Sequence, residues 1–560
     1  MGNFSPMKEA IRTVLKEALE RLGLDDVPAS AIEVDVPKRA EFGDYTTNAA
    51  MVLAKRAGME PRRLAERVAA ELERSGGDLF KAVEVQGPGF INFFVRESAI
   101  TSALATIRSQ GERYGRARHG EGRRVLVEFV SANPTGYLHM GHARNAAVGD
   151  AVASLLEAVG YEVTREFYIN DAGRQVEMLG RSVYARYLQL FGREATMPED
   201  GYMGDYVVTL AEEVRQKWGE RYLEVDENAA VEELAEYAKD RLLDAIKETL
   251  RTFGVEFDVW YSEKRDLVAC SAGGGGRVGE VLVALASKGA TYAKDGAVWF
   301  KATAYGDSQD WVLVKSDGSH TYFLNDIAYH LDKVRRGFDT LINVWGADHH
   351  SHVTRLKAAL KALCVDDDRL RVVLIQFVRL MRRGEEVKMS KRAGSFVTMN
   401  DVMAEVGSDV MRFFLLMRSA DTHLDFDLEL AKEQSSENPV YYVQYANARI
   451  NSVKQKAAER GIGAEGGETA LLIDPMEVAL TKKLLSFPEV IDESARALAP
   501  HKVVYYLLDV ASDFHVYYNR VRIITEDDRL TRARLFFIDC VQHVIRNGLK
   551  ILGVSVPDRM

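Results

Sequence analysis

The 560-residue chain has few of the features that mark secreted, metal-binding or membrane proteins. Only three cysteines occur, Cys270, Cys364 and Cys540, and they lie far apart without a CxxC spacing. A disulfide framework and a cysteine-based zinc site are therefore not supported. The N-terminus lacks the apolar segment of a secretory signal, and no stretch approaches the roughly 18–20 apolar residues of a membrane-spanning helix. These absences predict a cytoplasmic protein that is not inserted in a membrane.

An excess of positive charge is also missing. The chain has 73 Lys and Arg residues against 83 Asp and Glu residues, a formal net charge of −10. Whole-chain charge therefore does not indicate a nucleic-acid-binding protein, and a polyanionic partner would need a local basic patch. Hydrophobic residues make up 47% of the chain and charged residues 28%, as in folded globular proteins. The length corresponds to about three or four packing units, which excludes a single small binding module.

Residue patterns divide the chain into three predicted domains. Residues 1–115 begin with an amphipathic helix over 7–23 and include two short strands joined by a Gly-Pro-Gly turn at 87–89. This pattern predicts an α+β N-terminal domain. Residues 406–560 have helical periodicity almost throughout, with a glycine-rich loop at 461–467, and predict an all-α helical bundle.

The middle region, residues 116–405, has the pattern of a doubly wound parallel sheet. A nearly continuous apolar run at 125–130 precedes a loop, a helical stretch over 141–158 and a second strand, which is how a Rossmann-like α/β domain begins. The charged, helix-rich segment 170–265 is predicted to be an insertion, and residues 297–314 predict a small antiparallel sheet. The remaining parallel strands are expected at 163–169, 340–344 and 372–378.

The tetrapeptide His139-Met140-Gly141-His142 stands between the predicted strand and helix. A helix N-terminus offers unpaired N–H groups and partial positive charge, and Gly141 lets a ligand approach the backbone closely. Two imidazoles one turn apart can donate to phosphate oxygens. The motif indicates a nucleotide-phosphate site, although taken alone it also fits two surface histidines near a helix start.

A second motif, Lys388-Met389-Ser390-Lys391-Arg392, lies near the other end of the same predicted domain. Lysines on a loop can move as point charges toward a polyphosphate and neutralise the charge that develops when it is displaced. Taken alone the segment fits a solvated charged loop, but the order and placement of the two motifs together favour a shared phosphate site.

These two motifs resemble the HIGH and KMSKS signatures of class I aminoacyl-tRNA synthetases, except that Arg392 stands where that class usually has Ser. The segments Ser131–Asn145 (SANPTGYLHMGHARN), Phe167–Gln175 (FYINDAGRQ) and Arg412–Leu430 resemble the bacterial arginyl-tRNA synthetases. Residues 36–50 resemble the additional N-terminal domain of that family, so the resemblance covers nearly the whole chain. It implies contact of this first domain with the tRNA elbow.

An arginine side chain is a permanent planar cation with five donors, so its pocket needs carboxylates and preferably an aromatic face. Tyr322 and Asp326 lie four residues apart in a predicted helix and therefore on one face. The resemblance assigns Tyr322, Asp326 and Glu263 to the guanidinium group. It assigns Asn133 to the α-amino and carboxylate end, with Ser131 also binding arginine. From the residues alone, Tyr322 would be a core residue and Glu263 a solvated acid.

The histidine-rich loop Gly346–His352 follows a predicted strand, at the sheet edge where ligands gather. No cysteine or acid spacing completes a metal site there, so no metal-binding residue is predicted. The resemblance instead places this loop beside ATP, which is expected to act with Mg²⁺. The implied ATP-binding residues are His139, Gly141, His142, Gly346, Asp348, His349, Met389, Ser390 and Lys391, and the implied catalytic residues are His139, His142, Lys388 and Lys391.

In the last predicted domain, aromatic and basic residues gather in two groups. Anticodon bases are single-stranded, and they are read by aromatic stacking and by arginine hydrogen bonds. The same tyrosines also fit a bundle core, and the same arginines a solvated face. The resemblance favours tRNA binding by Tyr441, Tyr445, Asn447, Arg449, Arg520 and Arg522.

The resemblance implies a two-step reaction of L-arginine, ATP and tRNA(Arg) in a monomeric enzyme. The arginine carboxylate attacks the α-phosphorus of ATP, and a ribose hydroxyl of the tRNA 3′ end then attacks the arginyl-adenylate. Three alternatives remain: a glutaminyl- or glutamyl-type class I synthetase, a nucleotidyltransferase that shares the HxGH motif, and a non-catalytic tRNA-binding paralogue. Two carboxylates in the pocket argue against the first alternative, because they would repel an anionic side chain.

Overall fold

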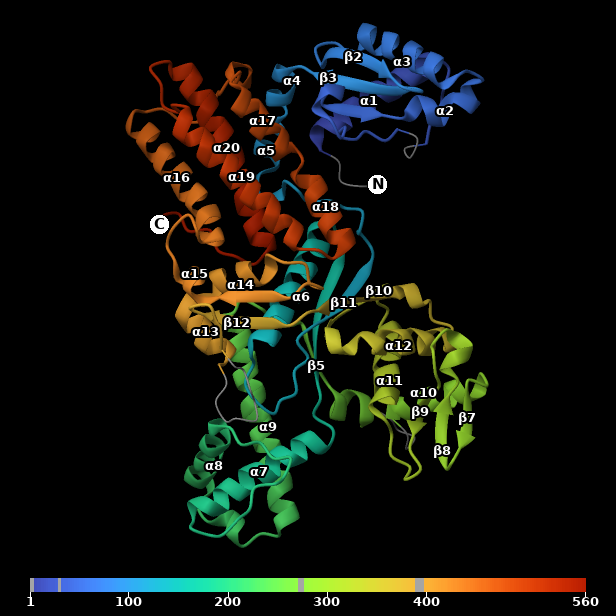
Figure 1. The fold of residues 1–560 in the computed structure, drawn as a ribbon, viewed down its shortest axis with the longest axis vertical. Coiled ribbons are helices and arrows are strands. Elements are labelled where there is room, and N and C mark those ends of the chain that lie inside the picture. Colours follow the sequence, from blue (N-terminus) through green and yellow to red (C-terminus); the bar gives the residue numbers. More distant parts are fainter. Residues whose placement is uncertain (1–4, 29–31, 270–275, 388–396) are drawn as a thin grey trace.

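The computed structural model describes residues 5–28, 32–269, 276–387 and 397–560 and divides into an N-terminal unit, a central sheet region with two lobes, and a helical bundle (Figure 1). The N-terminal unit is an antiparallel three-stranded sheet of order β1-β3-β2 packed with helices. The predicted helix and strand pair are confirmed, and β1 is an additional strand. The elements are α1 (Pro6–Arg21), β1 (Tyr45–Thr47), α2 (Ala49–Ala57), α3 (Pro61–Ser75), β2 (Phe80–Gln86) and β3 (Phe90–Val95).

Two short helices, α4 (Glu97–Ser102) and α5 (Leu104–Gln110), follow β3 and pack against the C-terminal helices. Asn547 fastens the next turn by donating to the carbonyls of Gly111 (2.9 Å) and Tyr114 (3.0 Å). The segment before the expected boundary at 115 is therefore buried against the bundle. An amphipathic pattern predicts that one face of a helix is buried, but it does not predict which domain covers that face.

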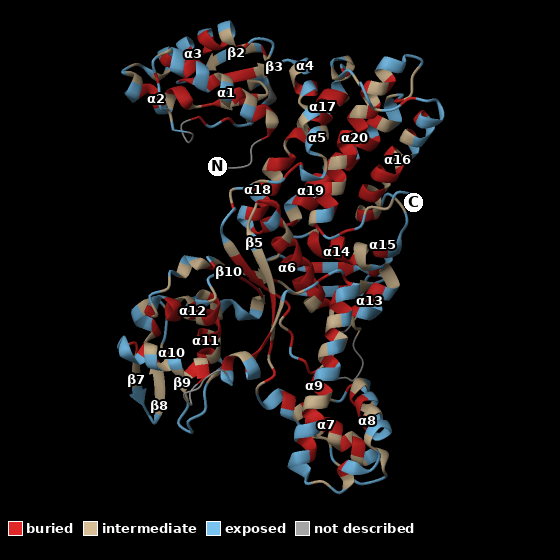
Figure 2. Cartoon of the chain, turned by 180° about the vertical axis from the view of Figure 1, so that it is seen from behind, coloured by how far each residue is buried: buried red, intermediate tan, exposed pale blue. Residues whose placement is uncertain are grey.

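The central sheet has five strands in the order β11-β10-β4-β5-β6, and every neighbouring pair is parallel. This confirms the Rossmann-like doubly wound class. Helix α6 (Met140–Ala158) is buried along most of its length (Figure 2). A Cβ on its Gly149 would lie 2.3 Å from the Phe129 ring, so glycine permits this close packing. The strands are β4 (Arg124–Glu128), β5 (Glu162–Ile169), β6 (Val259–Ser262), β10 (Thr340–Gly346) and β11 (Leu370–Ile375).

Two lobes extend from the sheet, as Figure 1 shows below its centre. The predicted insertion is a helical lobe with its own apolar core, and the predicted antiparallel sheet of order β7-β8-β9 forms the second lobe with three helices. The helical lobe contains α7 (Arg174–Leu190), α8 (Asp205–Trp218) and α9 (Glu227–Thr252). The second lobe contains α10 (Gly276–Ser287), β7 (Thr291–Lys294), β8 (Ala297–Phe300), β9 (Trp311–Val314), α11 (Tyr322–Arg335) and α12 (His350–Ala362).

Two details of the predicted secondary structure are wrong. The strand expected at 372–378 is divided, because β11 ends at Ile375 and the chain enters another sheet as β12 (Val378–Arg382) with β13 (Glu385–Glu386). The C-terminal region also contains a strand, β14 (Leu424–Asp427), which pairs in parallel with β12. The strand has only two buried and two exposed residues in alternation, and this pattern is too short to be recognised in a sequence that is otherwise helical.

The rest of the C-terminal region is helical, as predicted. Figure 2 shows buried residues on the facing sides of its long helices and exposed residues on the outside. No helix in the described ranges is both long enough and apolar enough to cross a membrane. The helices are α13 (Met399–Val406), α14 (Ser408–Leu416), α15 (Leu428–Lys432), α16 (Pro439–Glu459), α17 (Pro475–Leu485), α18 (Phe487–Ala497), α19 (His501–Arg520) and α20 (Asp528–Ile551).

Candidate active site

The HMGH motif forms the N-terminus of α6, at the point where the strand order reverses between β4 and β10. His139 is the N-cap residue. Its Nδ1 accepts a hydrogen bond from the N–H of Gly141 (3.1 Å), and Nδ1 of His142 accepts one from the N–H of His139 (3.2 Å). The two rings stack with their centroids 3.8 Å apart. Because each Nδ1 is an acceptor, a neutral ring carries its proton on Nε2 and presents a donor there.

Gly141 suits this arrangement, since a Cβ at this position would lie 3.0 Å from Cε1 of His139 and the ring would have to shift. Asn145, one turn later, connects the motif to the turn after β4 and to β10. Its Oδ1 accepts from the N–H of Val130 (2.7 Å), and its Nδ2 donates to the carbonyl of Val344 (2.9 Å). Val130 and Ser131 have φ angles of 65° and 39°, a strained region for residues with a Cβ. Asn145 therefore helps to hold a strained turn between β4 and α6.

The second sequence motif cannot be placed against the first, because Lys388, Met389, Ser390 and Lys391 lie outside the described residues. The β12–β13 hairpin leads into this segment. The hairpin is connected to the HMGH helix by Arg144, which is fully buried and donates to the carbonyl of Gln376 (2.9 Å) just before β12. The start of this hairpin and the HMGH helix are thus joined directly.

The loop Gly346–His352 runs from the end of β10 into α12. Asp348 and His349 are exposed there, whereas His352 is half-buried with its Nε2 2.8 Å from Oδ2 of Asp326. Within the part of the chain that the structure describes, no group of three or more His, Cys, Asp or Glu side chains is placed to hold a metal ion. His352 instead lies beside a residue of the expected arginine pocket.

Glu263 begins a π-helical turn directly after β6 and is only 2% exposed. Its Oε1 accepts a hydrogen bond from Nδ2 of Asn325 (2.6 Å), and the Tyr168 side chain also bonds to it. Burial raises the pKa of Glu263 to about 7, although these two hydrogen bonds act in the opposite direction. The charges of Asp326 and Asp171 raise the pKa further. A bound cation would favour the ionised form of this carboxyl.

Tyr322 and Asp326 both lie on α11, as the residue spacing predicted. Tyr322 is 63% exposed, so it is not the core residue that its pattern alone suggests. It lines two cavities, one of about 730 Å³ that also includes Trp311 and one of about 910 Å³ that also includes Gly136. Asp326 is half-buried. The Tyr322 ring thus borders the space between the two lobes, and Asp326 lies one turn further along the same helix.

Ser131 is joined to the Glu263 pocket, whereas Asn133 is exposed on the loop between β4 and α6. Oγ of Ser131 accepts from the N–H of Tyr168 (3.1 Å), whose side chain bonds to Glu263. Sequence reasoning missed Tyr168 and Asn325 as parts of the pocket. Tyr168 lies in a segment that carries the family resemblance, and Asn325 lies between Tyr322 and Asp326. Their side chains reach Glu263 only because folding brings these segments together.

The expected tRNA-binding residues of α16 divide into surface and interior positions. The rings of Tyr441 and Tyr445 stack, with centroids 5.9 Å apart, and the Arg449 guanidinium lies 4.6 Å from the Tyr445 ring and 4.8 Å from the Tyr518 ring. These side chains are half-buried and form one aromatic and cationic surface. Such a surface can stack unpaired bases.

Asn447 departs from the prediction, because it has no exposed surface. Its Nδ2 donates to the carbonyl of Pro557 (2.7 Å), and its Oδ1 accepts from Nε2 of Gln542 (2.8 Å) and Nε of Arg546 (3.0 Å). It therefore joins α16 to α20 and the C-terminal segment inside the bundle and presents nothing to RNA. Arg520 and Arg522 are exposed at the end of α19.

Family models match almost the whole chain. The arginyl tRNA synthetase N terminal domain matches residues 9–95, the class I (R) tRNA synthetase catalytic domain matches 103–424, and the DALR anticodon binding domain matches 443–560. The arginine–tRNA ligase of Syntrophotalea carbinolica is 47% identical over 564 residues, which cover 99% of this chain and 100% of that protein. The arginine–tRNA ligase of Caldanaerobacter subterraneus is 47% identical, with coverages of 99% and 98%.

The fold has the same relatives. Thermus thermophilus arginyl-tRNA synthetase superposes with a TM-score of 0.72 at 24% identity and covers 99% of this chain and 100% of its own. At that identity the likeness shows the fold alone, and the family follows from the catalytic-domain match and the full-length relatives. With the HMGH motif at the switch point of its sheet, the chain belongs to the arginyl-tRNA synthetase family of class I synthetases.

Proposed function

We propose that this chain is an arginine–tRNA ligase that activates L-arginine with ATP and transfers it to the 3′-terminal adenosine of tRNA(Arg). In the first step, an oxygen of the arginine carboxylate attacks the α-phosphorus of ATP, and pyrophosphate leaves. In the second step, a ribose hydroxyl attacks the carbonyl of arginyl-adenylate, and AMP leaves. Substrates supply both nucleophiles, so the protein aligns the reactants and stabilises the developing charge.

The observation that carries this proposal is the buried carboxylate Glu263, which is joined through Tyr168 to the strained Ser131 turn and lies close enough to Asp326 for their charges to interact. Two carboxylates and the Tyr322 ring suit a planar cation. Two carboxylates would repel the anionic side chain of glutamate. A neutral glutamine side chain would leave them without a charged partner. Asn133 and Ser131 are proposed to hold the α-amino and carboxylate end.

The phosphate side is assigned to the HMGH helix and the loop after β13. ATP enters as its Mg²⁺ complex, and the Nε2–H groups of His139 and His142 donate to its phosphates. Gly141 permits close approach, and Lys388 and Lys391 supply positive charge that neutralises the charge developing during displacement. The remaining proposed ATP contacts are Gly346, Asp348, His349, Met389 and Ser390.

Binding of tRNA(Arg) is assigned to the surface of Tyr441, Tyr445, Arg449, Arg520 and Arg522, from which Asn447 is removed. In an Arg449→Ala variant, the KM for tRNA(Arg) should rise about tenfold, because one aromatic-stacked cation is lost. The KM for arginine should stay unchanged, and a matched Arg460→Ala variant at the end of the same helix should have little effect.

We further propose a monomeric, cytoplasmic enzyme whose domains span 1–115, 116–405 and 406–560.

Pyrophosphate exchange with each of the twenty amino acids, with and without tRNA(Arg), tests the function. Of the twenty amino acids, only arginine should support exchange. Exchange with glutamine or glutamate instead would overturn the proposal. Exchange with arginine in the absence of tRNA would leave the proposal intact and show that activation does not wait for tRNA.

A further inference from the structure

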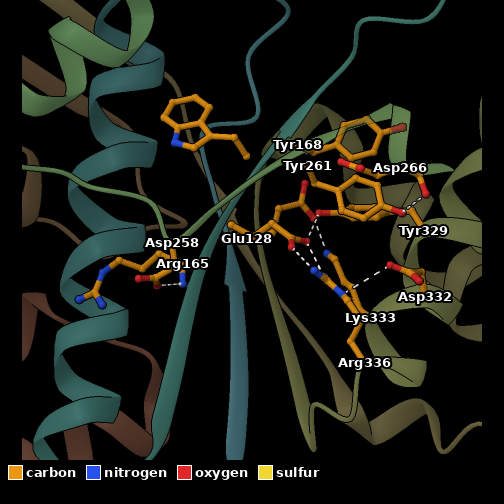
Figure 3. A network of polar contacts seen from close by, with 12 residues as sticks. Glu128, Arg165, Tyr168, Asp258, Tyr261, Asp266, Tyr329, Asp332, Lys333 and Arg336 are labelled. Carbon is orange, nitrogen blue, oxygen red and sulfur yellow. Dashed lines mark hydrogen bonds and ion pairs between the residues drawn. The ribbon is translucent and has the colours of Figure 1, made fainter. Parts of the chain in front are cut away.

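A network of charged side chains is buried between α11 and the central sheet, beneath the arginine pocket. Figure 3 shows Lys333 of α11 and Arg336, the residue that follows this helix, reaching toward Glu128 and the neighbouring tyrosines. Lys333 has no exposed surface, and its Nζ lies 2.6 Å from Oε2 of Glu128. Arg336 donates in the same way to the fully buried Glu166 (2.6 and 2.9 Å). None of these four residues has a role in the proposed reaction.

One chain of hydrogen bonds leads from Lys333 to Ser131 and Glu263. Lys333 donates to Glu128, and the other carboxylate oxygen, Oε1, accepts from Oγ of Ser131 (3.0 Å). That Oγ in turn accepts from the N–H of Tyr168 (3.1 Å), and the side chain of Tyr168 bonds to Glu263. The strained turn at Ser131 and the pocket carboxylate are therefore connected to a single buried cation.

A second chain leads from the same Lys333 to the backbone of Asp326. Nζ of Lys333 donates to Oδ1 of Asn343 (3.3 Å), and Nδ2 of Asn343 lies 2.7 Å from Nε2 of His330. Nδ1 of His330 lies 2.8 Å from the carbonyl of Asp326. Burial and the charge of Lys333 lower the pKa of His330, so its ring is neutral. Its proton is then on Nδ1, which donates to the carbonyl of Asp326, while Nε2 accepts from Nδ2 of Asn343.

We propose that Lys333 is a positioning residue for the arginine side of the site: it fixes Ser131, Glu263 and Asp326 relative to one another before arginine binds. The inference deepens the proposed function and rests on it. Lys333 lies at the junction of the two chains, and through them it reaches three of the five proposed arginine-binding residues. The two chains of hydrogen bonds end at residues of the arginine side and include neither His139 nor His142, so the larger effect is expected on arginine binding.

The energetics favour positioning over stability as the role of this ion pair. Taking two charges out of water costs several kcal/mol per ion, and apolar replacement of both partners is often neutral or stabilising. A buried pair is thus weak evidence for a stabilising contact. Non-glycine residues with positive φ, such as Val130 and Ser131, persist only where the surroundings determine them fully.

The first test is Lys333→Met in the full-length enzyme, followed by steady-state pyrophosphate exchange with saturating tRNA(Arg). The KM for arginine should rise about tenfold or more, while the KM for ATP stays within about twofold. A comparable rise in both constants would show a general structural role and overturn the proposal. The matched control is Lys239→Met, which removes a largely buried lysine paired with Glu236 (2.5 Å) on α9 and should leave both constants unchanged.

A second variant keeps the test informative if the single change prevents folding by leaving Glu128 unpaired. Glu128→Gln with Lys333→Met removes both charges but retains an acceptor for Ser131. Its thermal midpoint should return to within about 2 °C of the wild type, while the arginine KM stays raised about threefold or more because Asn343 has lost its donor. If the arginine KM recovers together with the midpoint, Lys333 only neutralises Glu128.

The two proposals can fail separately in this experiment. A wild-type enzyme without arginine-dependent exchange would defeat the proposed function. An active wild type and a Lys333→Met variant with an unchanged arginine KM would defeat the positioning role alone.

Discussion

The phosphate side of the site, around His139 and His142, is half-buried and shaped by backbone N–H groups, whereas the arginine side, around Glu263, is buried and shaped by side chains. The two histidines cap a helix and use one ring nitrogen each for that purpose. Glu263 instead depends on Tyr168 and Asn325, which come from other elements. Phosphates are bound through donors that a helix N-terminus supplies locally, while discrimination of a side chain requires carboxylates fixed by tertiary contacts.

The largest expected effect separates the two sides most clearly. In a Lys391→Ala variant, adenylate formation should slow about 10²–10³-fold, because one cation no longer stabilises the displaced phosphates. The Kd of arginine should stay nearly unchanged, since the pocket carboxylates are intact. Single-turnover kinetics and equilibrium binding measure the two quantities. Equal losses in both would contradict a division between the sides, and Lys288→Ala, an exposed lysine on the second lobe, is the control.

A Glu263→Gln variant should show the reverse pattern. Loss of one charge-assisted contact to the guanidinium should raise the KM of arginine about 10- to 100-fold, with the KM of ATP nearly constant. Steady-state exchange at varied arginine and ATP measures both constants. Asp266→Asn is the control, because this carboxylate lies on the same turn and is paired with Arg265 instead. An ATP KM that rises as much as the arginine KM would show that the sides are not independent.

The pH dependence of arginine binding sharpens the comparison, because only the arginine side holds a carboxyl whose pKa is raised to about 7. Arginine favours the ionised form, so its KM should fall as the pH rises through 7 and level off above it. Between pH 6 and pH 8 the change should be about tenfold. In Glu263→Gln the dependence should disappear. A wild-type KM that is flat over this range would exclude titration of Glu263.

The smallest effect is on stability. The raised pKa means that the unfolded chain, in which a glutamate titrates near 4.5, loses this proton more readily than the folded chain. The contribution of Glu263 to the stability of the ligand-free enzyme is therefore most favourable below pH 4.5 and becomes less favourable as the pH rises toward 7. At pH 8 Glu263→Gln should raise the thermal midpoint by about 2–4 °C for each kcal/mol regained. Thermal unfolding at pH 8 and pH 5 measures the difference, which should shrink at the lower pH.

Much of the fold follows from local patterns. The apolar run at 125–130, the helix after it and the helical insertion were all predictable, because burial on both faces and helical periodicity are written in adjacent residues. The strand β14 was not, since two buried residues within a helical region give too weak a signal. Asn447 was expected at an RNA surface because it lies near Tyr441 and Tyr445 in the sequence, but its side chain faces α20 instead.

The candidate site shows the same division. HMGH was recognisable because its helix-capping chemistry depends on residues three positions apart. Tyr168 and Asn325 were not, because their contacts with Glu263 bridge 95 and 62 positions of the chain. Lys333 carries no local sign of its role, since a lysine on a helix is normally solvated.

The amino-acid sequence by itself determined the three-part division, the Rossmann-like sheet and the position of the HMGH motif at a helix N-terminus. Only the tertiary structure decided which of the candidate carboxylates is buried, what holds it and which charges are paired beneath it. The physical reason is that periodicity and helix capping act over a few residues. Desolvation and hydrogen-bond partners, in contrast, are set by groups that meet only when β4, β5, β6, β10 and α11 pack together.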